Sequence, residues 1–305
     1  MKVLLTGGSG FIGSHVLAAL QDEGVEVVVI GRSRLPGAFR QIEADLLTLT
    51  QNEINELLRD ECITHLLHLA WVAEHGKYWT SPLNLRWVDA TVHLVEAFCA
   101  AGGQHAVIAG TCAEYDWSYG YCREESTPLS PTTLYGAAKD ATRRLVTKVC
   151  EQHQVSCAWG RVFLPFGYGE ANNRLIPSLI EVFLGKQEPY SVNIAAFRDF
   201  LHVSDVAAGF VSLLTSNASG EFNISSGIPT PIKEIVTVLA DLLRADPQLI
   251  FSLSRERRDE PILLVGENLK LKTLGWKPNL RIQQGFERVV NERLSYNSVK
   301  LPGTK

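Results

Sequence analysis

Lys2-Val-Leu-Leu-Thr-Gly7-Gly-Ser-Gly10-Phe11-Ile12-Gly13 is the stretch that decides the fold. Its first five residues predict a buried strand, and the apolar spacing that starts at Ile12 predicts a helix. Gly7 permits the sharp turn between them, Gly10 lets the backbone approach a phosphate, and Gly13 lets the helix pack close to the strand. Phe11 and Ile12 open the helix, whose N-terminus carries unpaired N–H groups and a positive dipole end. The order of elements predicts the pyrophosphate cradle of a dinucleotide cofactor, with an ordinary glycine-rich turn as the alternative.

The first half of the chain repeats this alternation of strand and helix. Strands are predicted at 2–6, 25–30, 64–70, 105–110 and 155–163, and helices at 11–23, 50–61, 82–101 and 132–153. The strands are apolar nearly throughout, which is typical of parallel strands buried on both faces. We therefore predict an α/β fold of the Rossmann type, a doubly wound parallel sheet with its chemistry at the carboxyl ends of the strands.

The alternation stops after Phe163, where prolines and glycines predict a loop-rich crossing. Helical patterns return at 174–185, 204–216, 231–243 and 282–295. We predict a dinucleotide-binding domain over residues 1–164, with a return segment near 199–226. Residues 165–305 are predicted to form a smaller, mainly substrate-binding α/β lobe.

Bulk composition narrows the possible partners. The 305 residues carry a net charge of −4, so no basic surface predicts a nucleic-acid partner. The six cysteines show neither CxxC pairs nor zinc spacing, which favours reduced thiols and no metal site. The glycine turn interrupts the apolar start, and no apolar run is long enough to cross a bilayer. We expect a cytoplasmic protein that has no membrane partner.

The end of the second predicted strand bears on the choice of cofactor. An NAD site would place Asp or Glu there to accept a hydrogen bond from the ribose 2′-hydroxyl. This chain has Gly31 followed by Arg32, Ser33 and Arg34. Guanidinium groups can bind a 2′-phosphate bidentately, so NADPH is predicted, with NAD held by neutral contacts as the alternative. After a short third strand, Asp45 and Leu46 are expected against the adenine, unless Asp45 caps a turn.

Tyr135 and Lys139 form the predicted acid/base pair. Their spacing of four residues places them on one face of a helix. A phenol has a reference pKa of about 10, and a neighbouring ammonium favours the phenolate. The pair is therefore expected to bring the pKa of Tyr135 closer to neutral. The alternative is a surface tyrosine beside a solvated lysine.

Two strand ends are predicted to lie beside this pair. Thr111 ends the fifth strand, where its hydroxyl either holds a substrate oxygen or caps the following turn. Leu69, Ala70 and Trp71 follow the fourth strand and are expected to flank the cofactor rings.

Six motifs together resemble one known family. They are Gly7-x-x-Gly10-x-x-Gly13, Thr111, Tyr135-x-x-x-Lys139, Arg161-Val-Phe163, Arg198-Asp-Phe-Leu-His-Val-Ser-Asp205 and Glu221-Phe-Asn-Ile-Ser. In order and spacing they resemble the extended short-chain dehydrogenase/reductases, the group of nucleotide-sugar epimerases, dehydratases and reductases, over nearly the whole chain. The resemblance implies that Tyr135 is the acid/base, that Lys139 orients the nicotinamide ribose and that Thr111 supplies the usual hydroxyl.

The resemblance also implies a nucleotide-sugar substrate bound by arginines. Arg198 matches the family's Arg-Asp-Phe motif, which is expected near the nucleotide phosphates. Arg257 or Arg258 resembles a second phosphate clamp, and Arg174 is expected to reach the sugar. For each arginine the alternative is a surface ion pair. The helices at 82–101 and 132–153 resemble the pair that forms a homodimer interface in this family.

Some positions depart from the family pattern. Cys112 and Ala113 stand where the 4,6-dehydratases have an Asp-Glu pair, so we reject dehydration. Glu114 comes one position later and would point elsewhere if the segment is locally extended. Cys112 is either a general acid beside the substrate or a buried bystander thiol. Two family asparagines are replaced by Trp87, in the helix predicted at 82–101, and by Leu164.

A reductase consumes a fresh hydride in each cycle, which cells commonly supply as NADPH. Because Arg32 and Arg34 favour NADPH, we predict the NADPH-dependent reduction of the 4-keto group of a nucleotide-linked 4-keto-6-deoxyhexose. The alternative is an NAD-dependent nucleotide-sugar 4-epimerase, whose cofactor stays bound. A less favoured hypothesis is a non-catalytic dinucleotide-binding sensor, which would typically lack the tyrosine or the lysine.

Overall fold

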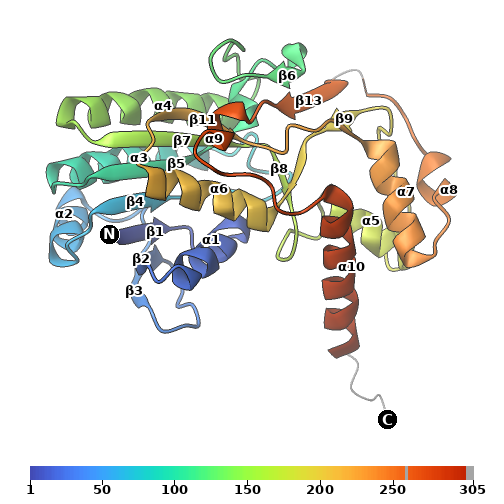
Figure 1. The fold of residues 1–305 in the computed structure, drawn as a ribbon, viewed down its shortest axis with the longest axis horizontal. Helices are drawn as coiled ribbons and strands as arrows, with labels where there is room; N and C mark the ends of the chain where they lie inside the picture. Colours follow the sequence, from blue (N-terminus) through green and yellow to red (C-terminus); the bar gives the residue numbers. More distant parts are fainter. Residues whose placement is uncertain (258–259, 300–305) are drawn as a thin grey trace.

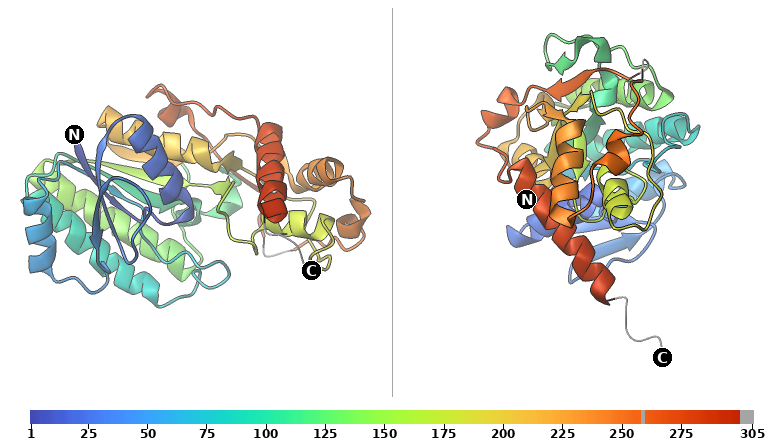
Figure 2. Two further views of the ribbon diagram at one scale, coloured as in Figure 1. Left: turned by 90° about the horizontal axis from the view of Figure 1, so that it is seen from below. Right: turned by 90° about the vertical axis from the view of Figure 1, so that its right-hand side faces the viewer.

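The computed structural model describes residues 1–257 and 260–299. Within these residues the centre is a seven-stranded parallel sheet with the order β11-β7-β5-β4-β1-β2-β3. Its strands are β1 (Lys2–Thr6), β2 (Glu26–Gly31), β3 (Arg40–Glu43), β4 (His65–His68), β5 (His105–Thr111), β7 (Ser156–Val162) and β11 (Gly220–Ile224). Helices cover both faces of this sheet (Figures 1 and 2). The predicted Rossmann-type α/β fold is confirmed.

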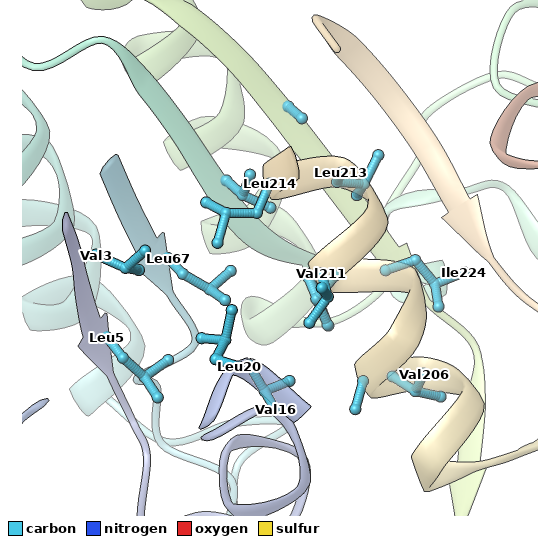
Figure 3. Close-up of a cluster of buried hydrophobic side chains, with 14 of the residues drawn as sticks. Val3, Leu5, Val16, Leu20, Leu67, Val206, Val211, Leu213, Leu214 and Ile224 are labelled. Carbon is cyan, nitrogen blue, oxygen red and sulfur yellow. The ribbon is translucent and has the colours of Figure 1, made fainter. Parts of the chain in front are cut away.

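The two faces of the sheet have separate cores because neighbouring residues of a strand point to opposite sides. Val3 and Leu5 of β1 face α1 (Phe11–Asp22) and α6 (Val203–Ser216), as Figure 3 shows. Leu4 belongs to the opposite core, beneath α2 (Gln51–Asp60), α3 (Leu83–Ala100) and α4 (Leu134–His153). The strands are therefore buried on both sides, as their apolar composition predicts.

A smaller lobe lies beside the sheet, on the right in Figure 1. A third core joins its helices α5 (Leu175–Phe183), α7 (Ile232–Leu243), α8 (Gln248–Phe251) and α10 (Ile282–Val299). Short strands link the lobe to the sheet: β8 (Leu164–Phe166) pairs with β10 (Phe200–His202), and β12 (Thr230–Pro231), β9 (Phe197–Arg198), β13 (Leu263–Gly266) and β6 (Tyr121–Cys122) form a four-stranded sheet. The remaining short helices are η1 (Cys112–Glu114), η2 (Trp117–Tyr119) and α9 (Leu269–Lys272). Helix α6 and strand β11 follow α5 in sequence but return to the central layers.

Some element boundaries differ from the prediction. Strand β4 ends at His68, because the backbone N–H groups of Leu69 and Ala70 donate to the Thr6 hydroxyl. Helix α4 begins at Leu134, because the Thr133 side chain caps it by accepting from the Gly136 N–H. In each case a side-chain hydrogen bond fixes the boundary, which the apolar pattern does not show.

None of the helices among the described residues combines the length and the apolar character needed to cross a membrane. No group of three His, Cys, Asp or Glu side chains among those residues is arranged to hold a metal ion.

The strand register brings the predicted site residues to one edge of the sheet. Thr6 lies opposite both Ile30 and His68, and His68 lies opposite Ile108. The glycine turn after β1, the residues after β4 and Thr111 at the end of β5 therefore meet at the carboxyl edge, where ligands bind in such sheets.

Candidate active site

The glycine turn has the shape that a dinucleotide phosphate needs. Gly7 has a positive φ of 73°, and a Cβ there would approach the Ala70 nitrogen to 2.7 Å. A Cβ on Gly13 would overlap the carbonyl oxygen of Gly7. Gly10 caps α1 without a side-chain hydrogen bond, and the first turn of the helix holds no acidic residue. The backbone N–H groups at this helix start can therefore bind an anion, so the cradle fits a cofactor pyrophosphate.

The region where the adenosine end is expected is open and basic. Arg32, Ser33 and Arg34 follow β2 and are exposed, and no ion pair joins either guanidinium to another described residue. Asp45 accepts a hydrogen bond from the Leu47 N–H at 3.0 Å, so it caps a turn, which is the alternative role predicted for it. Leu46 is buried in the core beneath α2 and α3.

Thr111, Tyr135 and Lys139 come together at the end of β5. Edge-on aromatic rings surround Tyr135, with centroids 4.8 Å away for Tyr78 and 5.7 Å away for Trp79. The Lys139 Nζ donates to the carbonyl oxygen of Ala109 at 2.8 Å. It also lies 3.8 Å from the centroid of the Trp71 ring. The lysine is therefore buried between a strand end and an aromatic face.

Burial dominates the protonation of this group. It raises the pKa of Tyr135 well above the usual 10, an effect that Tyr78 reinforces and that a hydrogen bond with the Thr111 side chain opposes. It lowers the pKa of Lys139 to about 7, against the influence of Glu114. The expectation that Lys139 makes Tyr135 more acidic is therefore wrong: the ammonium group faces Ala109 and Trp71, and desolvation disfavours the phenolate.

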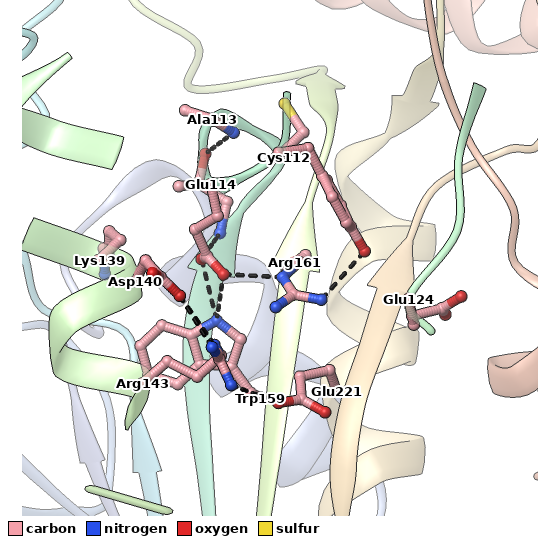
Figure 4. Close-up of polar contacts among 12 residues, drawn as sticks. Cys112, Ala113, Glu114, Glu124, Lys139, Asp140, Arg143, Trp159, Arg161 and Glu221 are labelled. Atoms are coloured by element: carbon pink, nitrogen blue, oxygen red, sulfur yellow. Dashed lines mark hydrogen bonds and ion pairs between the residues drawn. The ribbon is translucent and has the colours of Figure 1, made fainter. Parts of the chain in front are cut away.

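A buried set of polar residues holds the turn that carries Thr111 (Figure 4). We call it the Glu114 network; its members are Glu114, Tyr115, Trp159, Arg161 and Asn223. The Glu114 carboxylate accepts from the Thr111 N–H at 2.8 Å, from the Trp159 Nε1 at 2.9 Å and from the Arg161 Nε at 2.7 Å. Arg161 also donates to the Tyr115 hydroxyl, which in turn donates to Asn223. Each of these side chains has a partner within the network.

The residues after Thr111 are not extended. They form η1, so the condition of a locally extended segment is not met, but Glu114 does point elsewhere and engages Trp159 and Arg161. Cys112 is buried, and burial raises the pKa of its thiol well above the usual value. Such a thiol is a poor proton donor at neutral pH, which supports the bystander role of the two predicted for Cys112.

Three arginines line a cavity of about 570 Å³ between the sheet and the smaller lobe; we call it the arginine cavity. The Arg174 Nε donates a hydrogen bond to the Glu170 carboxylate at 3.0 Å. The Arg198 Nη1 donates to the Pro261 carbonyl at 2.7 Å, and its Nη2 lies 3.6 Å from Glu260. Arg257 pairs with the same Glu260 at 2.9 Å. Arg258, which the family resemblance offers as the alternative to Arg257 for the second phosphate clamp, lies outside the described residues.

Several polar atoms in the wall of this cavity have no partner. Among the described residues these include His75 Nδ1, Glu170 Oε2 and Asn193 Oδ1. Burial raises the pKa of Glu170 to about 7, although Arg174 opposes it. Buried polar atoms in folded proteins almost always have a hydrogen-bond partner, which is the protein itself, ordered water or a ligand.

The sequence did not single out some residues that the structure places at the site. Tyr78 contacts Tyr135 edge-on, and its side chain is hydrogen-bonded with Arg174, so it links Tyr135 to the arginine cavity. Asn84, one turn before Trp87, is buried and accepts from the Trp71 Nε1 at 2.8 Å, so α3 does begin with an asparagine that orders this loop. Two adjacent aromatic residues after β4, Tyr78 and Trp79, are the sequence feature that could have pointed to this wall around Tyr135.

Comparison with known proteins identifies the family. Residues 3–225 match the model of the NAD dependent epimerase/dehydratase family. The chain is 28% identical to a UDP-glucose 4-epimerase of Corynebacterium glutamicum over 91% of each chain. It is 24% identical to a GDP-6-deoxy-D-mannose reductase of Pseudomonas aeruginosa, covering 95% of this chain and 96% of the relative.

Solved structures of MoeE5 superpose closely. Its complex with UDP-glucuronic acid and NAD has a TM-score of 0.84 and 29% identity, over 97% of this chain and 100% of MoeE5. Its complex with UDP-glucose and NAD has a TM-score of 0.85, 28% identity and the same coverage. The chain therefore belongs to the NAD-dependent epimerase/dehydratase family, within the extended short-chain dehydrogenase/reductases that its motifs resemble.

Proposed function

We propose that the protein uses NADPH to reduce the 4-keto group of a nucleotide-linked 4-keto-6-deoxyhexose. The end of β2 carries the proposal. It offers no carboxylate to a ribose 2′-hydroxyl, and it presents the exposed guanidinium groups of Arg32 and Arg34, free of ion pairs to described residues. Such groups suit a 2′-phosphate, and NADPH is the usual source of hydride for biosynthetic reductions.

The position of Tyr135 supports its acid/base role in the proposed reaction. A reductase needs a protonated phenol that can deliver its proton to the developing alkoxide. Tyr135 is hydrogen-bonded with the Thr111 side chain, so the two hydroxyl groups lie together at the end of β5. In the proposed mechanism Thr111 holds the substrate oxygen and Tyr135 protonates it, while the bound nicotinamide supplies the hydride. Lys139 is proposed to hold the nicotinamide ribose.

The arginine cavity supports a nucleotide-sugar substrate. Arg198 and Arg257 share one carboxylate, Glu260, which leaves guanidinium N–H groups for a diphosphate.

An NAD-dependent 4-epimerase is the second candidate, favoured by the C. glutamicum relative and by the NAD in both MoeE5 complexes. One experiment separates the two. NADPH and NADH are each mixed with the protein and with dTDP-, CDP- and GDP-linked 4-keto-6-deoxyhexoses. A fall in NADPH absorbance supports the reductase, whereas retained NAD with reversible interconversion of UDP-glucose and UDP-galactose supports the epimerase. Turnover in neither assay would favour the non-catalytic sensor.

We also propose a homodimer formed through α3 and α4, which pack side by side. Leu85 on α3 is 60% exposed and Leu145 on α4 is 48% exposed. Exposed leucines on neighbouring helices favour burial against a second copy of the chain. Light scattering of the purified protein tests the stoichiometry, and Leu145→Glu should yield monomers.

A further inference from the structure

MoeE5 has been solved with UDP-glucuronic acid and with UDP-glucose. These two ligands differ only at C6, which is a carboxylate in the first and a hydroxymethyl group in the second. The charges around the arginine cavity of the present chain bear on which kind of sugar it accepts. The inference rests on the proposed nucleotide-sugar function and names the class of sugar.

The first observation is the charge balance of the cavity wall. Its described residues include three guanidinium groups, from Arg174, Arg198 and Arg257, and two carboxylates, from Glu170 and Glu260. Each guanidinium lies within ion-pair distance of one of these carboxylates. A nucleoside diphosphate sugar brings two negative charges, which already exceed the surplus of one positive charge. A uronate would bring a third charge into a partly desolvated site, where it is costly.

The second observation is the position of Glu170. The residue is 7% exposed, and one oxygen binds the Arg174 Nε while the other oxygen has no partner. Arg174 also contacts Tyr78, which lies edge-on to Tyr135. Glu170 is thus connected through Arg174 and Tyr78 to the group proposed to act on the sugar, and we assign it to the sugar end of the cavity on this ground. Glu260 lies with Arg198 and Arg257, the groups proposed to bind the diphosphate.

We propose that Glu170 selects sugars without a carboxylate, so that the substrate is a neutral hexose or 6-deoxyhexose and a uronic acid is rejected. Its negative charge in the cavity wall repels a sugar carboxylate. The charge of Arg174 is already compensated by Glu170, so Arg174 offers no free positive charge to a uronate.

Isothermal titration calorimetry with UDP, UDP-glucose and UDP-glucuronic acid tests this proposal in the cofactor-loaded protein. Wild-type protein should bind UDP-glucose at least about tenfold more tightly than UDP-glucuronic acid, a difference of roughly 1.4 kcal/mol. Glu170→Gln keeps the size of the side chain and removes its charge. It should narrow this ratio at least about fivefold, mainly by strengthening the binding of UDP-glucuronic acid.

Glu260→Gln is the matched control, because it also removes one carboxylate from the cavity wall. It acts on Arg198 and Arg257, so it should change the affinity for both sugar nucleotides by the same factor and leave their ratio unchanged. A ratio near one in the wild type, or equal narrowing by both variants, overturns the proposal. If UDP and both sugar nucleotides fail to bind, the proposed function falls for uridine nucleotides and the inference falls with it.

A pH series of the wild type gives a second test that needs no variant. The pKa of Glu170 is about 7, so this group gains charge between pH 6 and pH 8. The charged groups beside it are Arg174 and Arg293, burial lowers the pKa of His75, and burial raises the pKa of Tyr78 to about 12. The preference for UDP-glucose should therefore grow at least about threefold as the pH rises from 6 to 8. A preference that does not change with pH contradicts the role of Glu170.

Discussion

The Glu114 network and the arginine cavity are both polar, partly or fully buried regions near the carboxyl edge of the sheet, but they differ in how their polar atoms are satisfied. In the network, the carboxylate accepts from the indole and from the guanidinium, the guanidinium also donates to the hydroxyl, and the hydroxyl donates to Asn223. In the cavity wall, Glu170 and Asn193 each keep a buried oxygen without a partner. A fully paired cluster stabilises the fold, whereas an unpaired buried polar atom beside a cavity costs stability. Substitutions in the two regions should therefore change different properties.

The largest effect on stability is expected in the network. Glu114→Ala leaves the buried Arg161 without a counter-charge, so the free energy of unfolding should fall by about 3–5 kcal/mol. Urea unfolding measures this. Lys148→Ala is the control, because its ion pair with Glu151 is exposed and should contribute less than about 1 kcal/mol. Similar losses in the two variants would remove the distinction between the network and a surface pair.

The next effect concerns binding in the cavity. Arg198→Ala should weaken UDP binding about 10- to 100-fold, because a charge-assisted hydrogen bond contributes roughly 1.5–3 kcal/mol. The free energy of unfolding should fall by no more than about 1.5 kcal/mol. Calorimetry measures the affinity of this variant for UDP, and urea unfolding of the same sample measures its free energy of unfolding. Arg123→Ala, which removes an exposed pair with Glu267, should leave UDP binding unchanged. Unaltered binding in Arg198→Ala would show that the cavity does not hold the diphosphate.

A pH-dependent gain in stability is expected at Glu170. Its pKa rises from 4.5 to about 7 on folding, so the stability present below pH 4.5 is lost as the pH rises through 7. Glu170→Gln removes this loss. The change that it causes in the free energy of unfolding should therefore be about 2 kcal/mol more stabilising at pH 8 than at pH 5. Urea unfolding at the two pH values measures the difference. Equal effects at pH 5 and pH 8 would contradict the burial of a charged Glu170.

The smallest effect belongs to a neutral donor of the network. Trp159→Phe removes the Nε1 hydrogen bond to Glu114 but leaves the ion pair with Arg161 in place. The free energy of unfolding should fall by about 1–2 kcal/mol, clearly less than in Glu114→Ala. The same urea measurement serves, and a loss as large as that of Glu114→Ala would mean that packing of the indole, not charge pairing, dominates the network.

The sequence predicted the parts of the site that local pattern determines. Gly7, Gly10 and Gly13 identify the turn because close backbone approach requires glycine. The spacing of Tyr135 and Lys139 placed them correctly on one helix. Their pKa shifts could not be predicted, because the direction depends on burial by Tyr78 and Trp71, which come from another loop.

The cavity wall was harder to predict because its groups come from distant segments. Glu170 and His75 acquire their roles only when the loop after β8 is brought next to the loop after β4. The family's Arg-Asp-Phe motif predicts a binding role for Arg198, and the position of Arg174 at the start of the smaller lobe predicts one for Arg174. Nothing in their local sequence shows that carboxylates compensate them.

Proton transfer by Tyr135 is the central claim, and a single-turnover measurement on Tyr135→Phe tests it most directly. The variant is mixed with NADPH and the best ketosugar substrate, and nicotinamide absorbance is followed beside wild type and Tyr119→Phe, whose ring is exposed in η2. We expect hydride transfer to slow at least about 100-fold in Tyr135→Phe, with unchanged UDP affinity, and to be normal in Tyr119→Phe. A Tyr135→Phe rate within about threefold of wild type would contradict the account.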